Sequence, residues 1–352
     1  MATLIFVGGG TLGHIYPALP VIKEWKKRHP GDTIIYLACR RSSEQKLLSS
    51  IPEIDECHFF PLRGLAGKNV FRKARVLFGI VSDNIRMRKI IKLYKPSLVV
   101  GMGGSISGLF LRISHKAKCP IIIHEQNAVI GKANKWSLKW AEYFLTSFLL
   151  SPLHPRQKWI GNPRFDEAKK LANNAKKAHG YTNLMIVSGS LGAKIINKTA
   201  IAFLKSPHSL AYSTTLITGT RYFDECVQAL GASQKPHFKV VPFSDNLLEL
   251  MTEANIIVSR AGGTTMFEIL GLNKPMILIP SENVSDNHQL SNALSFAREN
   301  LAFVIEEKNL SPETFLSCLN RAWSLKKDPV NPYLMLKATE AFCETMEKVL
   351  KE

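Results

Sequence analysis

The stretch that decides the fold reads Ile256-Ile257-Val258-Ser259-Arg260-Ala261-Gly262-Gly263-Thr264-Thr265-Met266-Phe267-Glu268. Its apolar beginning is typical of a buried strand, and its glycines mark a turn at which a helix starts. Glycine permits close approach of the backbone to a ligand, and the N–H groups of a helix start bind anions, as do the hydroxyls of Thr264 and Thr265. Glu268 lies about one turn further along the helix, and since a carboxylate does not suit a phosphate, we expect it to bind a diol such as a ribose. The stretch predicts a nucleotide diphosphate site.

Two series of short apolar runs alternate with helical segments along the chain. Such runs are typical of parallel strands buried on both faces, and the alternation predicts two doubly wound α/β sheets. The runs are 4–7, 33–37, 98–100, 121–123 and 143–145 in the first half, and 184–187, 215–217, 238–241, 256–258 and 276–279 in the second. We expect the break at Gly161-Asn162-Pro163, which gives domains of residues 1–162 and 163–352. The helix expected over 332–352 has an imperfect apolar stripe that leaves its packing partner open between the two domains.

The composition describes a globular chain whose surface favours anionic partners. Of 352 residues, 45% are hydrophobic and 21% charged, with a net charge of +18. The six cysteines form no Cys-x-x-Cys pair and are expected to be free thiols in a reducing cytoplasm. No apolar run reaches about 18 residues and no signal-peptide pattern is present, so we expect a protein that is neither exported nor membrane-spanning.

Three further glycine loops follow expected strands and precede expected helices. They are 8–14, 101–108, which includes Gly104 and Ser105, and 188–193, in which Ser190 is placed to donate to a pyrophosphate. The first loop fits Gly-x-Gly-x-x-Gly poorly, and Arg40-Arg41 stands where a ribose-binding acid is expected after the second strand. A nicotinamide cofactor is therefore disfavoured.

His14 directly follows the first glycine loop. An imidazole with a pKa near neutrality can accept the proton of a hydroxyl, so we interpret His14 as a candidate general base. The alternative is a histidine that only packs in the first helical turn.

Polar residues also follow two other runs. His124-Glu125-Gln126-Asn127 comes after 121–123, and Gln289 precedes a helix after Pro280. We interpret the tetrad as a binding element, with capping of the following helix as the alternative, and Gln289 as placed to reach a sugar hydroxyl.

These motifs occur in the order expected of the MurG family of UDP-N-acetylglucosamine:lipid I N-acetylglucosaminyltransferases, which the chain resembles from about residue 3 to about residue 345. The resemblance implies the GT-B architecture, two doubly wound Rossmann-like domains facing across a cleft, with the UDP-sugar held by the second domain and the lipid-linked acceptor by the first. It implies an inverting transfer of N-acetylglucosamine to the muramyl 4-hydroxyl of lipid I, which gives lipid II for peptidoglycan synthesis. No metal or other cofactor is implied, and no Asp-x-Asp element is present.

The resemblance also implies roles for single residues. His14 would be the general base, Thr11 and Gly13 would line the donor sugar and acceptor phosphates, and Asn127 and Gln289 would contact the transferred sugar. Ser190 would take the donor diphosphate with support from Thr264 and Thr265, and Glu268 would bind the ribose. The matching motifs add four further expected substrate-binding residues, namely Gly104, Ser105, Glu125 and Arg260.

Three positions depart from the family pattern. Leu12 replaces a glycine in the first loop, which restricts backbone approach to a phosphate. Arg164 follows Pro163 immediately, one residue earlier than the family arginine that contacts the donor. Ser244 stands where the family often has an apolar residue whose backbone reads the uracil. We count all three among the expected binding residues.

The segment 63–95 holds ten cations and a single acid, Asp83, a net charge of +9. Its later part reads as an ordinary helix of the domain, whereas 67–73 sets apolar residues among cations and is expected to lie on anionic inner-leaflet lipid. This predicts a peripheral protein at the cytoplasmic face of the cell membrane. Nucleic acid is the rival anion, but no nucleic-acid-binding signature accompanies the charge, so no such partner is expected.

Three alternative functions share the same donor site. They are a UDP-sugar transferase with another lipid acceptor, a UDP-N-acetylglucosamine 2-epimerase, and a UDP-sugar-binding subunit without turnover. The tetrad at 124–127 favours a transferase over an epimerase.

Overall fold

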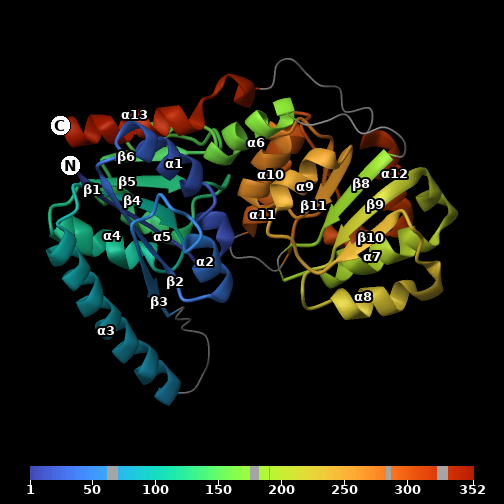
Figure 1. Cartoon of the computed structure of the whole chain (residues 1–352), viewed down its shortest axis with the longest axis horizontal. Helices are drawn as coiled ribbons and strands as arrows, with labels where there is room; N and C mark the ends of the chain where they lie inside the picture. The colour runs from blue at the N-terminus through green and yellow to red at the C-terminus, as the bar shows by residue number, and fades with distance from the viewer. Residues whose placement is uncertain (62–69, 175–181, 190, 283–286, 323–331) are drawn as a thin grey trace. The chain divides into compact units, whose positions relative to one another are not determined.

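The computed structural model describes residues 1–61, 70–174, 182–189, 191–282, 287–322 and 332–352. The chain forms two compact units (Figure 1). Unit 1 comprises Met1–Pro163 together with Leu336–Glu352, and unit 2 comprises Arg164–Met335. The second domain, expected over 163–352, therefore ends earlier, because the last helix belongs to unit 1.

Unit 1 is built on a seven-stranded, fully parallel sheet with the order β3-β2-β1-β4-β5-β6-β7. All five runs predicted in the first half lie in its strands. The strands are β1 (Thr3–Gly8), β2 (Thr33–Cys39), β3 (Glu56–Phe60), β4 (Leu98–Gly103), β5 (Ile121–Glu125), β6 (Tyr143–Thr146) and β7 (Gln157–Trp159). The edge strands β3 and β7 were not predicted, since β7 contains no apolar run and the run in β3 is only Phe59-Phe60.

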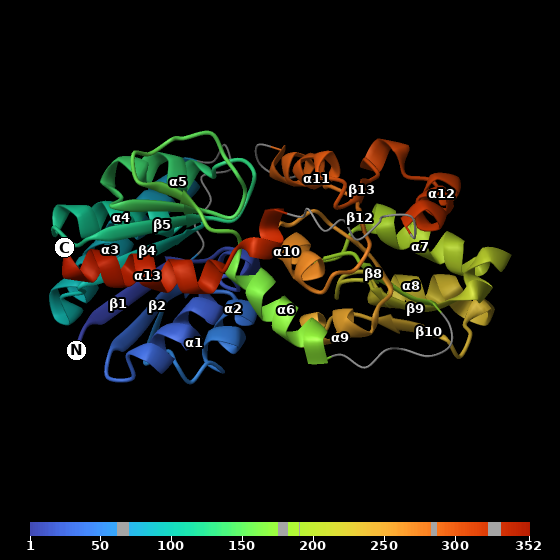
Figure 2. The same cartoon turned by 90° about the horizontal axis from the view of Figure 1, so that it is seen from above.

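Helices cover both faces of this sheet because successive strand residues point to opposite sides. Leu4 and Phe6 of β1 pack in one core with Trp25 of α1 and Phe342 of α13, whereas Ile5 of β1 packs in the other core with α3 and α4. Figure 2 shows α13 alongside α1. The helices of unit 1 are η1 (Leu12–His14), α1 (Ala18–Arg28), α2 (Ser42–Leu48), α3 (Val70–Tyr94), α4 (Ser107–Lys116), α5 (Lys132–Ser137), η2 (Leu138–Trp140) and α13 (Ala338–Lys351).

Unit 2 contains a six-stranded parallel sheet with the order β10-β9-β8-β11-β12-β13. Its strands are β8 (Thr182–Val187), β9 (Tyr212–Ile217), β10 (Phe238–Val241), β11 (Ile256–Ser259), β12 (Met276–Leu278) and β13 (Phe303–Val304). Its helices are α6 (Pro163–Asn174), α7 (Lys194–Lys205), η3 (Pro207–Ala211), α8 (Phe223–Leu230), η4 (Gly231–Ser233), α9 (Leu247–Glu253), α10 (Gly263–Gly271), α11 (His288–Arg298), η6 (Glu307–Asn309), α12 (Pro312–Ala322) and η7 (Pro332–Met335).

The two doubly wound sheets predicted from the sequence are thus confirmed. In each sheet the strand order reverses beside the first strand, between β1 and β4 in unit 1 and between β8 and β11 in unit 2. Ligands of such sheets bind at the carboxyl ends of the strands on either side of that reversal. The loops that follow these four strands are therefore where each unit is expected to bind its ligand. Within the described ranges, no helix has the length and apolar character needed to cross a membrane.

Candidate functional site

A buried carboxylate holds the loop after β1. Glu44 of α2 accepts hydrogen bonds from the backbone N–H of Gly10 at 2.8 Å and of Cys39 at 2.9 Å. Its side chain is fully buried, and this burial raises its pKa. We did not predict Glu44 from the sequence, although an acid in the first turn of a helix just after Arg40-Arg41 was the available signal. Glu44 ties the first glycine loop to the end of β2.

His14 lies at the end of η1, beside the loop after β4. Its Nδ1 is 3.0 Å from the hydroxyl oxygen of Thr11, and its carbonyl oxygen accepts a 3.4 Å hydrogen bond from Tyr36. A Cβ added at Gly103 would lie 3.0 Å from Cδ2 of the imidazole, so the ring rests against glycine backbone. Leu12 packs its side chain against the core of unit 1 and does not have a positive φ. Its substitution for glycine therefore places no strain on the backbone.

The glycine loop after β4 touches the loop after β1. Gly103 and Gly104 have φ values of 90° and 89°, and a Cβ added at Gly104 would lie 1.9 Å from the carbonyl oxygen of Gly9. No side chain fits at position 104 in this arrangement. Ser105 follows on the exposed side, with its hydroxyl 3.7 Å from the thiol of Cys39.

Glu125, the last residue of β5, holds the tetrad 124–127 and the loop that follows it. One carboxylate oxygen accepts from the backbone and side-chain nitrogens of Asn127 at 3.1 and 3.0 Å, and the other accepts from Gly131 N–H and the side-chain amide of Asn134 at 2.9 Å each. Glu125 is 1% exposed and its pKa is raised by burial. The buried side chain of Glu125 thus holds Asn127 in place through two hydrogen bonds. Asn134 lies on α5, and no sequence pattern pointed to it.

Neutral amides organise the loops of unit 2. Asn197 of α7 accepts from the Ser188 hydroxyl at 2.6 Å and donates to the carbonyl oxygen of Thr218 at 2.9 Å. Asn292 of α11 donates to the carbonyl oxygen of Ala261 at 3.1 Å. Both amides are buried, and neither was predicted from the sequence. Ser190 lies outside the described residues, so its contact with a diphosphate stays a prediction.

Helix α10 begins where the sequence placed it. Gly262 is the N-cap and Gly263 the first helical residue, so Thr264 and Thr265 both fall in the first turn. Thr264 is buried and Thr265 half-buried. The helix start therefore offers backbone N–H groups and hydroxyls together at the carboxyl end of β11.

Both arginines expected to bind substrate form ion pairs with carboxylates. Arg164 donates from Nε to Oε1 of Glu268 at 2.7 Å, and its Nη2 lies 2.7 Å from the same oxygen. Arg260 pairs with Glu307 of η6 and donates to the carbonyl oxygen of Ile279 at 3.0 Å. Burial raises the pKa of Glu268, and the neighbouring Arg164 opposes that rise.

The two remaining candidates, Gln289 and Ser244, lie on a helix and in a loop of unit 2. Gln289, in the first turn of α11, accepts a 2.9 Å hydrogen bond from the backbone N–H of Ser281. Ser244, in the loop after β10, accepts one of 3.2 Å from Asn246. The structure thus brings Thr11, Gly13, His14, Gly104 and Asn127 to neighbouring strand ends in unit 1. In unit 2 it places Arg260, Thr264, Thr265 and Glu268 on the loop and helix after β11.

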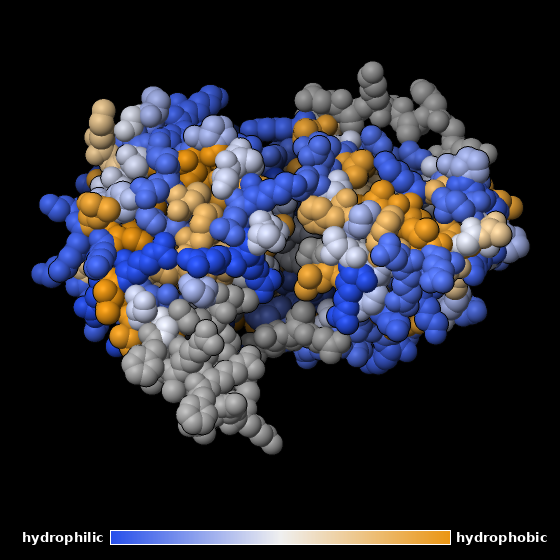
Figure 3. All heavy atoms as spheres, turned by 60° about the horizontal axis from the view of Figure 1, so that its bottom comes forward, coloured by the Kyte–Doolittle hydropathy of each residue, from blue (hydrophilic) through white to orange (hydrophobic). Residues whose placement is uncertain are grey.

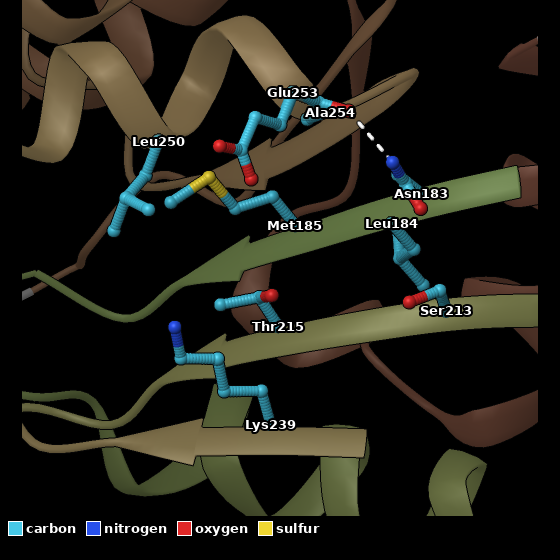
Figure 4. Close-up of a pocket in the computed structure, with 9 residues that line it drawn as sticks. All are labelled: Asn183, Leu184, Met185, Ser213, Thr215, Lys239, Leu250, Glu253 and Ala254. Carbon is cyan, nitrogen blue, oxygen red and sulfur yellow. Dashed lines mark hydrogen bonds between the residues drawn. The ribbon is translucent and has the colours of Figure 1, made fainter. Parts of the chain in front are cut away.

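A separate cavity of about 160 Å³ lies on the sheet face that α9 partly covers (Figure 4). Its wall is formed by side chains that share one face of β8, β9 and β10, together with residues of α9. Asn183 near the start of β8 donates to the carbonyl oxygen of Glu253 at 2.9 Å. None of the predicted site residues lines this cavity, so it is not the expected substrate site.

No group of three or more His, Cys, Asp or Glu side chains that suits a metal occurs in the part of the chain that the structure describes. The N-terminus of α10 offers backbone N–H groups to a diphosphate, whereas Arg164 and Arg260 are paired with Glu268 and Glu307. Preorganised donors of this kind stabilise developing negative charge.

Comparison with known proteins covers most of the chain. Residues 4–146 match the glycosyltransferase family 28 N-terminal domain, and residues 183–347 match the glycosyltransferase family 28 C-terminal domain. Two curated relatives carry the name UDP-N-acetylglucosamine–N-acetylmuramyl-(pentapeptide) pyrophosphoryl-undecaprenol N-acetylglucosamine transferase. The protein of Pediococcus pentosaceus is 31% identical over 326 residues, with 90% of this chain and 89% of the relative covered. That of Acetivibrio thermocellus is 32% identical over 365 residues, with 99% and 98% covered.

Among solved structures, that of Acinetobacter baumannii MurG is similar with a TM-score of 0.75 and 23% identity. The match covers 99% of this chain and all of the other. The likeness supports the same two-domain fold.

Proposed function

Since this chain belongs to glycosyltransferase family 28, and within it to the N-acetylglucosamine transferases of the MurG type, we propose that it moves N-acetylglucosamine from UDP-N-acetylglucosamine to the muramyl 4-hydroxyl of lipid I. The product would be lipid II, the precursor used in peptidoglycan synthesis and hence in cell shape and division. The observation that carries the proposal at the residue level is the Thr11–His14 pair, which belongs to the glycine loop after β1 and lies against Gly103 at the end of β4.

Unit 2 supplies the donor site in this proposal. The start of α10, with Thr264 and Thr265, takes the diphosphate together with Ser190, and Glu268 takes the ribose. As the bond to the sugar breaks, negative charge grows on the leaving UDP. Helix N–H groups and hydroxyls that already point at it stabilise that charge without a divalent ion.

Unit 1 supplies the base. Thr11 holds the imidazole of His14 through Nδ1, which favours a fixed ring orientation for taking the proton of the acceptor hydroxyl. That hydroxyl attacks the anomeric carbon from the face opposite UDP, so one base suffices and the configuration inverts. Asn127, which is held by two hydrogen bonds to Glu125, contacts the transferred sugar.

The acceptor is a lipid, and the surface of unit 1 suits a membrane. Trp136 is 45% exposed and packs against Trp140 with ring centroids 4.7 Å apart, while Arg112 and Lys139 lie over the two rings. Aromatic rings combined with cations are typical of membrane interfaces. We propose peripheral association with anionic lipid at the cytoplasmic face of the membrane, and no nucleic-acid partner.

Helix α3, which packs on α4, also exposes apolar side chains. Met87 and Ile90 of α3 are buried in the core, as expected for an ordinary helix of the domain, whereas Val81 and Ile85 are each 52% exposed. The segment 67–73, predicted to contact lipid, lies partly outside the described residues, and its side chains are not described. On the face drawn in Figure 3, hydrophobic residues form small groups among hydrophilic ones.

The deciding experiment measures transfer of labelled N-acetylglucosamine from its UDP donor to a short-chain lipid I analogue. The parent should transfer, and His14→Ala should lose about 10²–10⁴-fold in rate while binding UDP as the parent does. His208→Ala, an exposed histidine on η3, is the matched control and should behave as the parent. Equal rates for His14→Ala and the parent would refute the base assignment. Donor binding without transfer would point to another acceptor or to a subunit without turnover, and release of an altered free sugar would indicate an epimerase.

A further inference from the structure

Arg164 and Glu268 form a buried pair that joins two helices of unit 2. Arg164 stands at the beginning of α6 and Glu268 in the second turn of α10, and their side chains are 10% and 6% exposed. Nε and Nη2 of the guanidinium both contact Oε1 of the carboxylate, at 2.7 Å each, and Nη1 pairs with Glu167. Three nitrogens of the guanidinium are thus committed to carboxylates.

The geometry of the pair leaves half of the carboxylate available. Both contacts from Arg164 go to Oε1, and among the described residues Oε2 has no hydrogen-bond partner. A carboxylate oxygen accepts hydrogen bonds from hydroxyl donors. A vicinal diol could therefore donate to Glu268 without displacing Arg164.

Glu268 needs a cation to remain charged. Burial disfavours its ionised form, and the charges of Glu167 on α6 and Glu249 on α9 add to that effect. Arg164 is the group that opposes both. Without it, a carboxyl in this position would be driven towards the neutral acid, which is a weaker acceptor for a hydroxyl donor.

We propose that Arg164 is a positioning residue that acts through Glu268: it keeps the carboxylate charged and fixed, so that the site selects a nucleoside diphosphate with an intact ribose diol. The arginine itself does not contact the nucleotide in this arrangement. The inference deepens the proposed function and rests on it, because it concerns the donor of that reaction. It also gives a physical role to the one-residue shift that separates Arg164 from the family pattern.

A double-mutant cycle read with two nucleotides tests this. Binding of UDP and 2′-deoxy-UDP is measured by calorimetry for the parent, Arg164→Met, Glu268→Gln and the double variant. The parent should prefer UDP by about tenfold or more, since a hydrogen bond to a charged group is lost with the 2′-hydroxyl. Arg164→Met should reduce that preference to within about twofold of none, and should have no further effect on it when Glu268 is already Gln.

Two further measurements of the preference for UDP over 2′-deoxy-UDP distinguish a positioning role of Arg164 from a merely structural one. In Arg164→Met the preference should return as the pH is raised, because the Glu268 carboxyl ionises again, whereas the preference of the parent should not change with pH over the same range. Arg164→Lys should restore part of the preference at neutral pH. Glu167→Gln is the matched control: it removes the other ion pair of Arg164 and should keep the parent's preference.

The outcomes are distinguishable even if one variant folds poorly. The double variant leaves no unpaired buried charge, so it should fold where Arg164→Met alone is weakened. If Arg164→Met or Arg164→Lys weakens both nucleotides equally, with the preference unchanged, the arginine contacts the diphosphate and the inference is overturned while the proposed function stands. A parent that binds neither nucleotide would overturn both.

Discussion

The two units use the same strand order but stabilise their ligand loops with different chemistry. In unit 1, two buried carboxylates hold the loops: Glu44 bonds to the backbone after β1 and β2, and Glu125 bonds to the backbone and amides after β5. In unit 2, buried amides do this, with Asn197 holding the loop after β8 and Asn292 the loop after β11.

The difference follows from what a carboxylate and an amide can do. One carboxylate can accept several hydrogen bonds from N–H groups at once, and Glu125 accepts four. A carboxylate, however, adds a negative charge beside the loop. A side-chain amide can both donate and accept, as Asn197 does, and it adds no charge, which suits loops proposed to hold a diphosphate. The carboxylates near the unit 2 site, Glu268 and Glu307, each face an arginine instead. We therefore expect the loops of unit 1 to be more sensitive to substitution and protonation than those of unit 2.

The largest loss of stability and activity is expected from Gly104→Ala in unit 1, which is compared with Gly189→Ala in unit 2. Gly104→Ala places a methyl group 1.9 Å from the backbone oxygen of Gly9, so the loops after β1 and β4 must separate. We expect a loss of more than about 3 kcal/mol in unfolding free energy and about 100-fold or more in transfer. Gly189→Ala in unit 2 has a similar φ of 88°, but its nearest neighbour is Arg260 Cγ at 4.0 Å, so only about 1–2 kcal/mol should be lost. Urea unfolding and the transfer assay measure both, and equal losses would contradict the comparison.

The next effect compares a carboxylate with an amide. Glu125→Gln turns one acceptor oxygen into a donor that faces other donors, and should cost about 2–4 kcal/mol of unfolding free energy with a matching fall in transfer. Asn292→Ala removes a single hydrogen bond, to Ala261, and should cost about 1–2 kcal/mol. Denaturant unfolding of the two variants measures which loses more unfolding free energy. A larger loss for Asn292→Ala would mean that amides matter as much to unit 2 as carboxylates do to unit 1.

A smaller effect concerns pH. His124 at the end of β5 is fully buried, bonds to Ser147 at 3.2 Å, and has its pKa lowered by that burial from 6.5 to about 3. The unfolded chain therefore binds the proton first, so the stability that neutral His124 supplies is present above about pH 6.5 and is lost as the pH falls towards 3. Between pH 7 and 5 the loss is about 2 kcal/mol.

Hydrogen exchange of the strand amides in each unit measures this loss, with His124→Gln as the reference that lacks the titration. Glu44 and Glu125 act in the opposite direction, because burial raises their pKa, so the difference between parent and variant isolates the histidine. Identical acid sensitivity in parent and variant would show that the imidazole is not kept neutral.

The smallest expected effect is that of a chelator. If the helix start and hydroxyls of unit 2 stabilise the leaving diphosphate in place of a metal, excess EDTA should change the transfer rate by no more than about twofold. A rate that collapses with EDTA and returns with Mg²⁺ would show that these groups are insufficient.

Most of the fold could be predicted from local sequence patterns. Nine of the ten predicted apolar runs lie wholly in strands, and the tenth, 276–279, extends one residue past the end of β12. Helix α10 starts at Gly263, within the predicted glycine turn. Burial on both faces and a glycine turn each give a sequence pattern that spans only a few residues. Three edge strands, β3, β7 and β13, were not predicted. In β3 and β7 at most two apolar residues stand in a row, whereas β13 lies in an apolar stretch, 301–305, that the prediction did not include. The stripe of α13 predicted a helix but could not specify which core would receive it.

The candidate site was predictable only where its residues belong to a local motif. Glu44, Asn134, Asn197 and Asn292 hold the loops through contacts that form only in the folded chain. Arg164 and Glu268 were each predicted as binding residues, but they are 104 residues apart in sequence, so their pairing was not predicted. Such supporting residues follow from three-dimensional packing, which a motif does not encode.

The position of α13 has a consequence for synthesis of the protein. Phe342, Cys343, Met346 and Val349 complete the core formed by β1, β2 and α1, yet the ribosome makes them after all of unit 2. A nascent chain that has just finished Pro163 therefore exposes the apolar face of its first sheet until the last helix emerges. Unit 2 is encoded without interruption and can fold while it is being made, so the part of the chain translated first is the last to be completed.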